Sequence, residues 1–292
     1  MRRIRAAVLA AIAALGALCA PALAIAAPAM WRVRDADSEI YLFGTMHVLP
    51  AGLKWRTPLF DQAYARADQV WFETDMRASP ETLAALMAKY GVDTDRPLTQ
   101  KLTSKGLDDL KPLLDRRKVA LERLDHLRPW AAAMMLSVAP MVQKGASVRT
   151  GADATVTRAA AAEAKPIRTF ETLEEQMRMF AQLPESVEVQ YLEDVIAEQV
   201  RPPKNGVALQ KAWMNGAIDK LAPLLVKPMR RNRPALYDAL LKRRNEAWAE
   251  ALGERMQGSG VDLVNVGALH MVGDDGLPAL MAARGYEVTR VQ

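Results

Sequence analysis

The fold is decided by the apolar stretch Ile40-Tyr41-Leu42-Phe43-Gly44-Thr45-Met46-His47, which ends in Gly-x-x-His. A stretch of the same kind lies near the other end of the chain: Val261-Asp262-Leu263-Val264-Asn265-Val266-Gly267-Ala268-Leu269-His270. Each pattern predicts a buried strand that stops at a glycine and then presents a histidine. The chain has three histidines, and two of them occupy this repeated position. We take this pair as the centre of an active site or a metal site.

Residues 1–26 have the features of a secretory signal peptide. A basic segment, 1–5, precedes an apolar segment, 6–18, and small-x-small cleavage sites end at Ala24 and Ala26. An uncleaved anchor is the alternative, but the apolar run is short for a membrane span. We therefore expect a periplasmic or secreted protein that has no stable membrane span after cleavage.

Removal of this leader changes the composition of the chain. It leaves 36 Lys and Arg against 34 Asp and Glu, a net charge of +2 instead of +5. The basic residues alternate with acids along predicted helices, so the charge pattern does not indicate nucleic-acid binding. The single cysteine, Cys19, leaves with the leader. The mature protein therefore depends on its apolar core rather than on disulfides, and its site cannot be thiol-based.

Short strands separated by helices predict an α/β fold with α+β character. A helix over 58–67 followed by a strand over 69–75 is typical of a βαβ unit. Residues from about 79 to 164 are almost entirely helical in pattern. We therefore expect one domain, 27–292, in which a large helical insertion interrupts a central mixed sheet. The expected strands cover residues 31–34, 39–43, 69–75, 167–172, 261–266 and 286–291.

Two glutamates occur in a second repeat. Phe72-Glu73-Thr74 and Phe170-Glu171-Thr172 each stand at the end of a predicted strand. Ligands of open α/β sheets collect at the carboxyl ends of strands, so both acids and both histidines are expected there. A helix N-terminus is the competing explanation for each acid. It is strong for Glu171, because Thr172 and Glu175 have the spacing of a capping box.

This set of side chains points to metal-assisted hydrolysis. Two imidazoles and one or two carboxylates are a typical ligand set for Zn, Mn, Co or Fe. The glycines allow each imidazole to turn inward from its strand. A metal with an open position lowers the pKa of bound water and polarises a carbonyl, which makes hydrolysis the natural reaction. Hydrogen-bonded structural histidines are the alternative.

The remaining polar candidates have simpler explanations. His126 lies among charged neighbours on a predicted helix, which indicates a solvated surface residue. A long helix is expected over 234–254, on which Arg243 and Arg244 fit a charged outer face. The second interpretation of this helix is that Arg244 and Asn245 point into the cleft and hold a carbonyl or carboxylate.

Together these motifs resemble the TraB/GumN family, which includes the TIKI metalloproteases. The resemblance extends from about residue 31 to residue 291, and Arg244-Asn245 with Trp248 is similar to a helix motif of the family. The family is grouped with erythromycin-esterase-like and haem-binding ChaN-like proteins of similar fold. The motifs that carry the resemblance lie at 43–47, 72–73, 171–176 and 267–277.

The resemblance implies a metal-dependent peptidase or a related hydrolase with an erythromycin-esterase- or TIKI-like fold. His47, Glu73 and His270 are carried over as site residues, together with Glu171. TIKI proteins are associated with Mn or Co dependence and act on secreted signalling peptides. Some bacterial members are linked to the shutdown of conjugation pheromones or to polysaccharide clusters.

We therefore predict an exported metal-dependent hydrolase, in the first instance a peptidase, with a peptide or small-molecule substrate. His47, Glu73 and His270 would hold a divalent Mn, Co or Zn ion. Glu171 would be the general base or a further ligand, and Arg244 and Asn245 would orient the substrate. One alternative is a periplasmic protein that scavenges a peptide, haem or a signal molecule without turnover. Another is a metal-free esterase in which one histidine acts as the general base.

Overall fold

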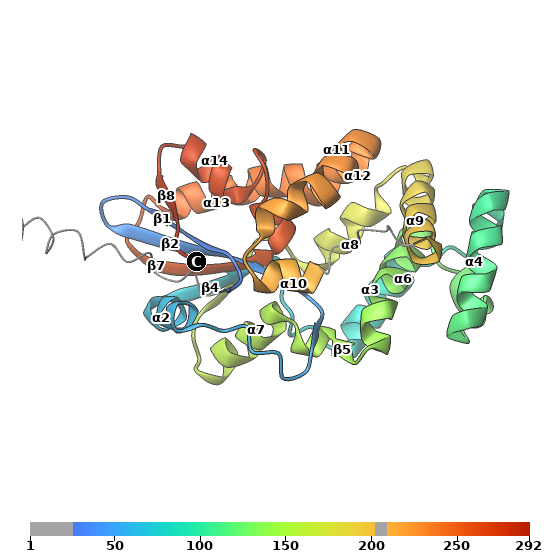
Figure 1. Ribbon diagram of the computed structural model, residues 1–292, viewed down its shortest axis with the longest axis horizontal. Helices are drawn as coiled ribbons and strands as arrows, with labels where there is room; N and C mark the ends of the chain where they lie inside the picture. The colour runs from blue at the N-terminus through green and yellow to red at the C-terminus, as the bar shows by residue number, and fades with distance from the viewer. Residues whose placement is uncertain (1–25, 202–208) are drawn as a thin grey trace, which may run out of the picture.

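The computed structural model describes residues 26–201 and 209–292, so nearly all of the expected leader lies outside the described part. Its centre is a six-stranded mixed sheet (Figure 1). In chain order the strands are β1 (Met30–Arg34), β2 (Ser38–Thr45), β4 (Gln69–Phe72), β6 (Ile167–Thr169), β7 (Gly260–Gly267) and β8 (Glu287–Arg290). They lie side by side in the order β6-β4-β7-β2-β1-β8, which confirms the predicted α/β class.

Four neighbouring strands run parallel, and one strand opposes them. β6 pairs with β4, β4 with β7 and β7 with β2, all in parallel. β1 runs antiparallel to both β2 and β8. The hairpin between β1 and β2 turns on Asp35, whose carboxylate accepts the backbone N–H of Asp37 and of Ser38 at 3.2 and 2.9 Å. Such local side-chain bonds favour Asp at tight turns.

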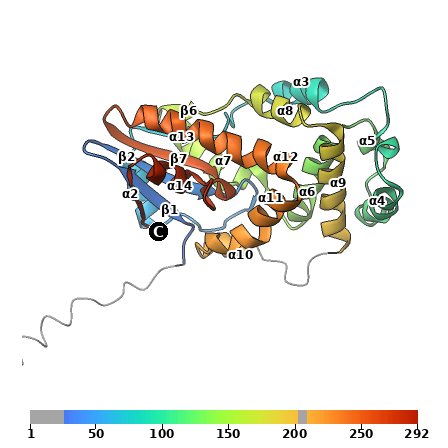
Figure 2. The same cartoon turned by 90° about the horizontal axis from the view of Figure 1, so that it is seen from above.

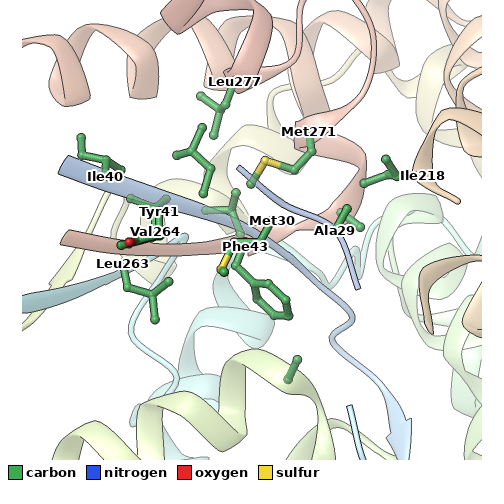
Figure 3. Close-up of a cluster of buried hydrophobic side chains, with 14 of the residues drawn as sticks. Ala29, Met30, Ile40, Tyr41, Phe43, Ile218, Leu263, Val264, Met271 and Leu277 are labelled. Carbon is green, nitrogen blue, oxygen red and sulfur yellow. The ribbon is translucent and has the colours of Figure 1, made fainter. Parts of the chain in front are cut away.

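Helices cover both faces of the sheet. In Figures 1 and 2, α2 (Pro58–Arg66) and α7 (Ala152–Ala162) lie on one side, and α13 (Arg243–Arg255) and α14 (Leu277–Ala283) lie on the other. Figure 3 shows Phe43 and Leu263 pointing to the face opposite Leu277. Because both faces are buried, β2 and β7 carry apolar side chains on both faces, without the alternation of a half-exposed strand. Asp262 and Asn265 are the buried polar residues of β7.

A helical lobe lies beyond the carboxyl ends of the parallel strands (Figure 1). It has its own apolar cluster, in which the rings of Trp130 and Phe180 stack with centroids 5.1 Å apart. Its helices are α3 (Pro80–Tyr90), α4 (Ser104–Arg117), α5 (Glu122–Asp125), α6 (Pro129–Gln143), α8 (Leu173–Ala181) and α9 (Glu185–Val200). The lobe differs from the expected insertion at 79–164, because α8 and α9, which follow β6 in the chain, also belong to it.

Helix α7 lies inside the expected insertion but packs with the sheet. Ala152, Val156 and Ala160 are fully buried members of the main core. They recur on one face of α7, and their small side chains let the helix lie close to the strands. The helix therefore connects the lobe to the sheet, and its first turn reaches the carboxyl ends of the strands.

The helix predicted over 234–254 is divided. It begins as α12 (Pro234–Tyr237), passes through a π-helical turn (Asp238–Lys242) and continues as α13. The other short elements are β3 (Leu49–Pro50), β5 (Ala146–Ser147), α10 (Leu209–Met214) and α11 (Lys227–Asn232), a second π-helical turn at Ala222–Val226, and 3-10 turns at Leu98–Gln100, Val148–Thr150, Ile218–Lys220 and Ala268–Met271. Among the described helices, none is long and apolar enough to cross a membrane.

Candidate functional site

Four strand ends meet at one edge of the sheet. Because β6, β4, β7 and β2 are parallel neighbours, their carboxyl ends leave the sheet on the same side. Glu171, Glu73, His270 and His47 follow these strands, at the strand ends where the sequence predicts them, and the strand order places them in that sequence across the sheet from β6 to β2. The side chains of Glu73 and His270 are 11% and 6% exposed, whereas that of His47 is 53% exposed. The cluster is therefore reached from solvent on the His47 side.

Glu73 lies at the centre of the cluster. Its Oε1 accepts the backbone N–H of Gly267 at 2.6 Å, and its Oε2 accepts an N–H of Arg244 at 2.7 Å. The amide of Gln176 donates to Oε2 at 3.4 Å. A buried carboxylate requires partners of this kind, because it has lost its hydration. The strand-end glutamate is thus fixed by contacts from β7, α13 and α8.

Both strand-end histidines turn Nε2 toward Glu73. Each Nε2 lies 3.7 Å from Glu73 Oε1. Gly267 leaves the space between them open, since a Cβ at this position would lie 3.1 Å from both Glu73 Oε1 and His47 Nε2. The glycine of the first Gly-x-x-His has a different role. A Cβ on Gly44 would meet Ala268 Cα at 3.0 Å, so this glycine lets β2 approach the turn before His270.

Asn245 fixes the orientation of His270. Its Oδ1 lies 2.6 Å from His270 Nδ1, and its Nδ2 donates to the carbonyl of Asp275 at 2.7 Å. Because the amide N–H is used by Asp275, Oδ1 is the acceptor and Nδ1 of His270 carries the hydrogen. Neutral His270 then keeps a lone pair on Nε2. The ring also packs against Trp248, with centroids 4.5 Å apart, and Trp248 stacks on Phe170.

Arg244 joins the two glutamates of the repeat. It donates to both oxygens of Glu171 at 2.7 and 2.9 Å and to Glu73 at 2.7 Å. Its Nη1 donates to the carbonyl of Leu240 in the π-helical turn and lies 3.3 Å from His270 Nε2. Such turns are frequent at functional sites. The Arg244 side chain is 10% exposed, which supports the inward interpretation, whereas Arg243 is a surface residue.

The two Phe-Glu-Thr segments are neighbours in space. The backbone N–H of Glu171 donates to the carbonyl of Glu73 at 3.0 Å, which extends the pairing of β6 with β4. The predicted capping box is confirmed: Thr172 and Glu175 each accept the other's backbone N–H, at 3.1 and 2.7 Å. Glu175 is the acid that caps α8, so the carboxylate of Glu171 remains available to Arg244.

Asp153 belongs to the cluster although no sequence motif marks it as a site residue. This residue lies in the first turn of α7, is 4% exposed, and places Oδ2 at 3.2 Å from His47 Nδ1. The available signal was an acid that follows Gly151-Ala152 and opens an otherwise small and apolar helix. Gln176 was also missed as a site residue, although it lies within one of the motif segments. His126, by contrast, is exposed at the end of α5, as predicted.

The charges in the cluster shift the pKa values of its members in opposite directions. Partial burial disfavours the charged form of the His47 ring, but Asp153 and Glu73 together outweigh this and raise the pKa of His47 to about 9. Burial, together with the positive charge of Arg244, lowers the pKa of His270 to about 3. Burial alone would raise the pKa of Glu73, but Arg244 and the histidines hold it well below its usual range. Without a metal, the two histidines therefore differ in charge at neutral pH.

The nitrogen and oxygen atoms of His47, His270 and Glu73 are suitable ligands for a divalent ion, although their side chains are not yet close enough together to form a complete site. Two ligands of one ion lie within twice the metal–ligand distance of about 2.0–2.2 Å, and each histidine meets this limit with Glu73 at 3.7 Å. Within residues 26–201 and 209–292, no three His, Cys, Asp or Glu side chains form a ready metal site. Arg244 Nη1 lies against His270 Nε2, so this contact must open before His270 can bind an ion.

The raised pKa of His47 predicts a pH-dependent stability for the metal-free protein. The folded protein holds this proton more tightly than the unfolded chain, whose usual pKa is 6.5. The stabilisation is therefore complete below pH 6.5 and is lost as the pH rises through about 9. Urea unfolding on both sides of this window should show a smaller loss of stability in His47→Gln than in the wild type. His270→Gln serves as the control and should keep the wild-type loss; an equal loss in all three proteins would contradict the assignment.

Comparison with protein families matches residues 29–290 to the TraB/PrgY/gumN family. Neither the comparison with curated proteins nor the one with solved structures found a match. The matched segment contains both Gly-x-x-His strands and both Phe-Glu-Thr strand ends, and it confirms the resemblance seen in the motifs. The chain belongs to the TraB/PrgY/gumN family.

Proposed function

We propose that the protein is an exported metal-dependent hydrolase, in the first instance a peptidase, that works outside the cytoplasm on a peptide or small-molecule substrate. His47, His270 and Glu73 would hold a divalent Mn, Co or Zn ion. The main support for the proposal is that both imidazoles face the carboxylate of Glu73. Both Nε2 atoms face one oxygen of one buried carboxylate, across a space that a glycine leaves open.

The charge of the cluster also supports a divalent ion. Glu73, Glu171 and Asp153 carry three negative charges against the one positive charge of Arg244, so with neutral imidazoles the four residues sum to −2. A divalent ion that displaces the proton of His47 would bring the cluster to neutrality. Buried charge is costly unless it is compensated, which favours this exchange.

The buried polar residues would prepare the site for this ion. Asn245 is 1% exposed, and both ends of its amide are occupied, so we assign it to His270 rather than to the substrate. Because Oδ1 of Asn245 accepts the hydrogen on Nδ1, the lone pair of His270 stays on Nε2, the atom that would bind the ion. The bound ion would supply an activated water and polarise a carbonyl.

Arg244 would stabilise the negative charge that develops on the substrate. Its planar guanidinium already forms a two-pronged pair with a carboxylate, the geometry that suits a carboxylate or a tetrahedral oxyanion. Glu171 uses both oxygens on Arg244, so we assign it to hold Arg244 in place. The role of Glu171 as general base would require this pair to separate during the reaction.

Removal of either histidine should abolish metal uptake. The metal-free protein would be incubated with Mn²⁺, Co²⁺ or Zn²⁺, freed of excess ion, and measured by elemental analysis without a His tag. The wild type should retain one ion per chain, and His47→Ala and His270→Ala should retain none while keeping the fold by circular dichroism. His126→Ala is the matched control and should bind as the wild type does, because His126 lies outside the cluster. Full uptake by either site variant would contradict the proposal.

Arg244→Lys should separate catalysis from metal binding. Lysine keeps the positive charge but lacks the two-pronged geometry, so kcat/KM in a peptide-library cleavage assay should fall by roughly a hundredfold or more. Metal uptake should remain that of the wild type. Arg243→Lys is the control, since Arg243 is a surface neighbour paired with Asp238. Cleavage that persists after exhaustive chelation would instead favour a metal-free esterase, and ligand binding without any turnover would favour a scavenging protein.

A further inference from the structure

We propose that Asp153 is a positioning residue for His47. Its carboxylate accepts the hydrogen on Nδ1 of His47 and so holds Nε2 toward Glu73. This inference rests on the proposed function, because it assigns a role to a residue that acts through His47. Asp153 itself lies on the far side of the imidazole from Glu73, since each faces a different ring nitrogen.

The first turn of α7 is docked on the backbone of the His47 segment. The N–H of Ala152 donates to the carbonyl of Met46 at 2.9 Å. Gly151 lies so close that a Cβ there would come within 2.2 Å of the carbonyl oxygen of His47. These backbone contacts fix the position of the segment Gly151-Ala152-Asp153 relative to His47. The carboxylate of Asp153 is therefore held beside the imidazole.

His47 requires such support more than His270 does. His270 is enclosed by Asn245, Trp248 and Arg244, whereas half of the His47 side chain is exposed. An exposed imidazole samples several rotamers, and ordering it costs conformational entropy. Among the described residues, Asp153 alone forms a hydrogen bond to the His47 ring. A carboxylate on the far nitrogen of a metal-binding histidine also fixes the tautomer and raises the basicity of the ring.

A purely structural role does not explain the position of Asp153. An acid in the first turn of a helix interacts favourably with the helix dipole, but that interaction does not require burial. Asp153 is 4% exposed, and its Oδ1 is buried without a hydrogen-bond partner in the described structure. Burying a carboxylate in this state lowers stability. The interaction with His47 is what offsets this cost, which places the role of Asp153 at the imidazole.

The test compares Co²⁺ binding to the metal-free forms of three variants. Asp153→Ala should weaken the affinity for Co²⁺ by about 10–100-fold, the usual effect of removing such a partner. Asp153→Asn keeps the shape and one acceptor oxygen, and should give a smaller loss. Thr157→Val is the matched control, because the Thr157 hydroxyl donates to the backbone carbonyl of Asp153 on the same helix and should be dispensable. Wild-type affinity in Asp153→Ala, or an equal loss in Thr157→Val, would overturn the inference.

A second readout does not depend on metal binding. In the metal-free wild type, the Nδ1–H of His47 should give a slowly exchanging, downfield proton resonance, identified by its absence from His47→Ala. Asp153→Ala should lose this resonance, and Thr157→Val should keep it. If the resonance persists in Asp153→Ala, Asp153 does not hold the ring. If the wild type takes up no Co²⁺ but the resonance behaves as expected, the metal proposal fails while the positioning role of Asp153 stands.

Discussion

The arrangement of the site depends on the burial of the Glu73 carboxylate. An ionised carboxylate at the end of an apolar strand is unfavourable unless strong donors replace its hydration. The backbone N–H of Gly267 and the guanidinium of Arg244 supply these donors at 2.6 and 2.7 Å. One donor belongs to the neighbouring strand and the other to a helix packed over the sheet. Glu73 can therefore be both buried and ionised only when β4, β7 and α13 are assembled together.

The same assembly brings the two histidines to one place. β7 lies between β4 and β2, so the residues that follow these three strands share the central part of the sheet edge. His270 is held rigidly by Asn245, whereas His47 is open to solvent on one side. A site of this kind has an enclosed half and an accessible half. The accessible half is where a substrate can enter, and it is also the half on which Asp153 acts.

The sequence predicts this site where local patterns carry the information. Apolar runs that end in Gly-x-x-His or Phe-Glu-Thr define strand ends, and the parallel order of strands places those ends together. Arg244 was harder to interpret, because two adjacent arginines on a polar helix fit a charged face equally well. Its inward orientation depends on a π-helical turn and on the two glutamates it neutralises. Neither the turn nor the pairing leaves a periodic signal in the sequence.

Neither the contact of Asp153 with His47 nor the full extent of the helical lobe could be predicted, for a related reason. Asp153 is more than a hundred residues from His47 in the chain, and only the docking of α7 on the segment that follows β2 brings them together. The lobe was expected as one continuous insertion, but its apolar cluster also takes residues from α8 and α9. Long-range packing of this kind depends on tertiary contacts, whereas periodicity reports only which face of each helix is apolar.

The central claim is that His47, His270 and Glu73 bind one divalent ion. The most direct measurement is anomalous X-ray scattering from crystals grown with Mn²⁺ or Co²⁺, recorded on both sides of the absorption edge of the metal. The account predicts a single strong peak bounded by His47 Nε2, His270 Nε2 and Glu73, at about 2.0–2.2 Å from each, with Arg244 turned away from His270. A peak elsewhere, or none at a saturating concentration of the ion, would contradict it.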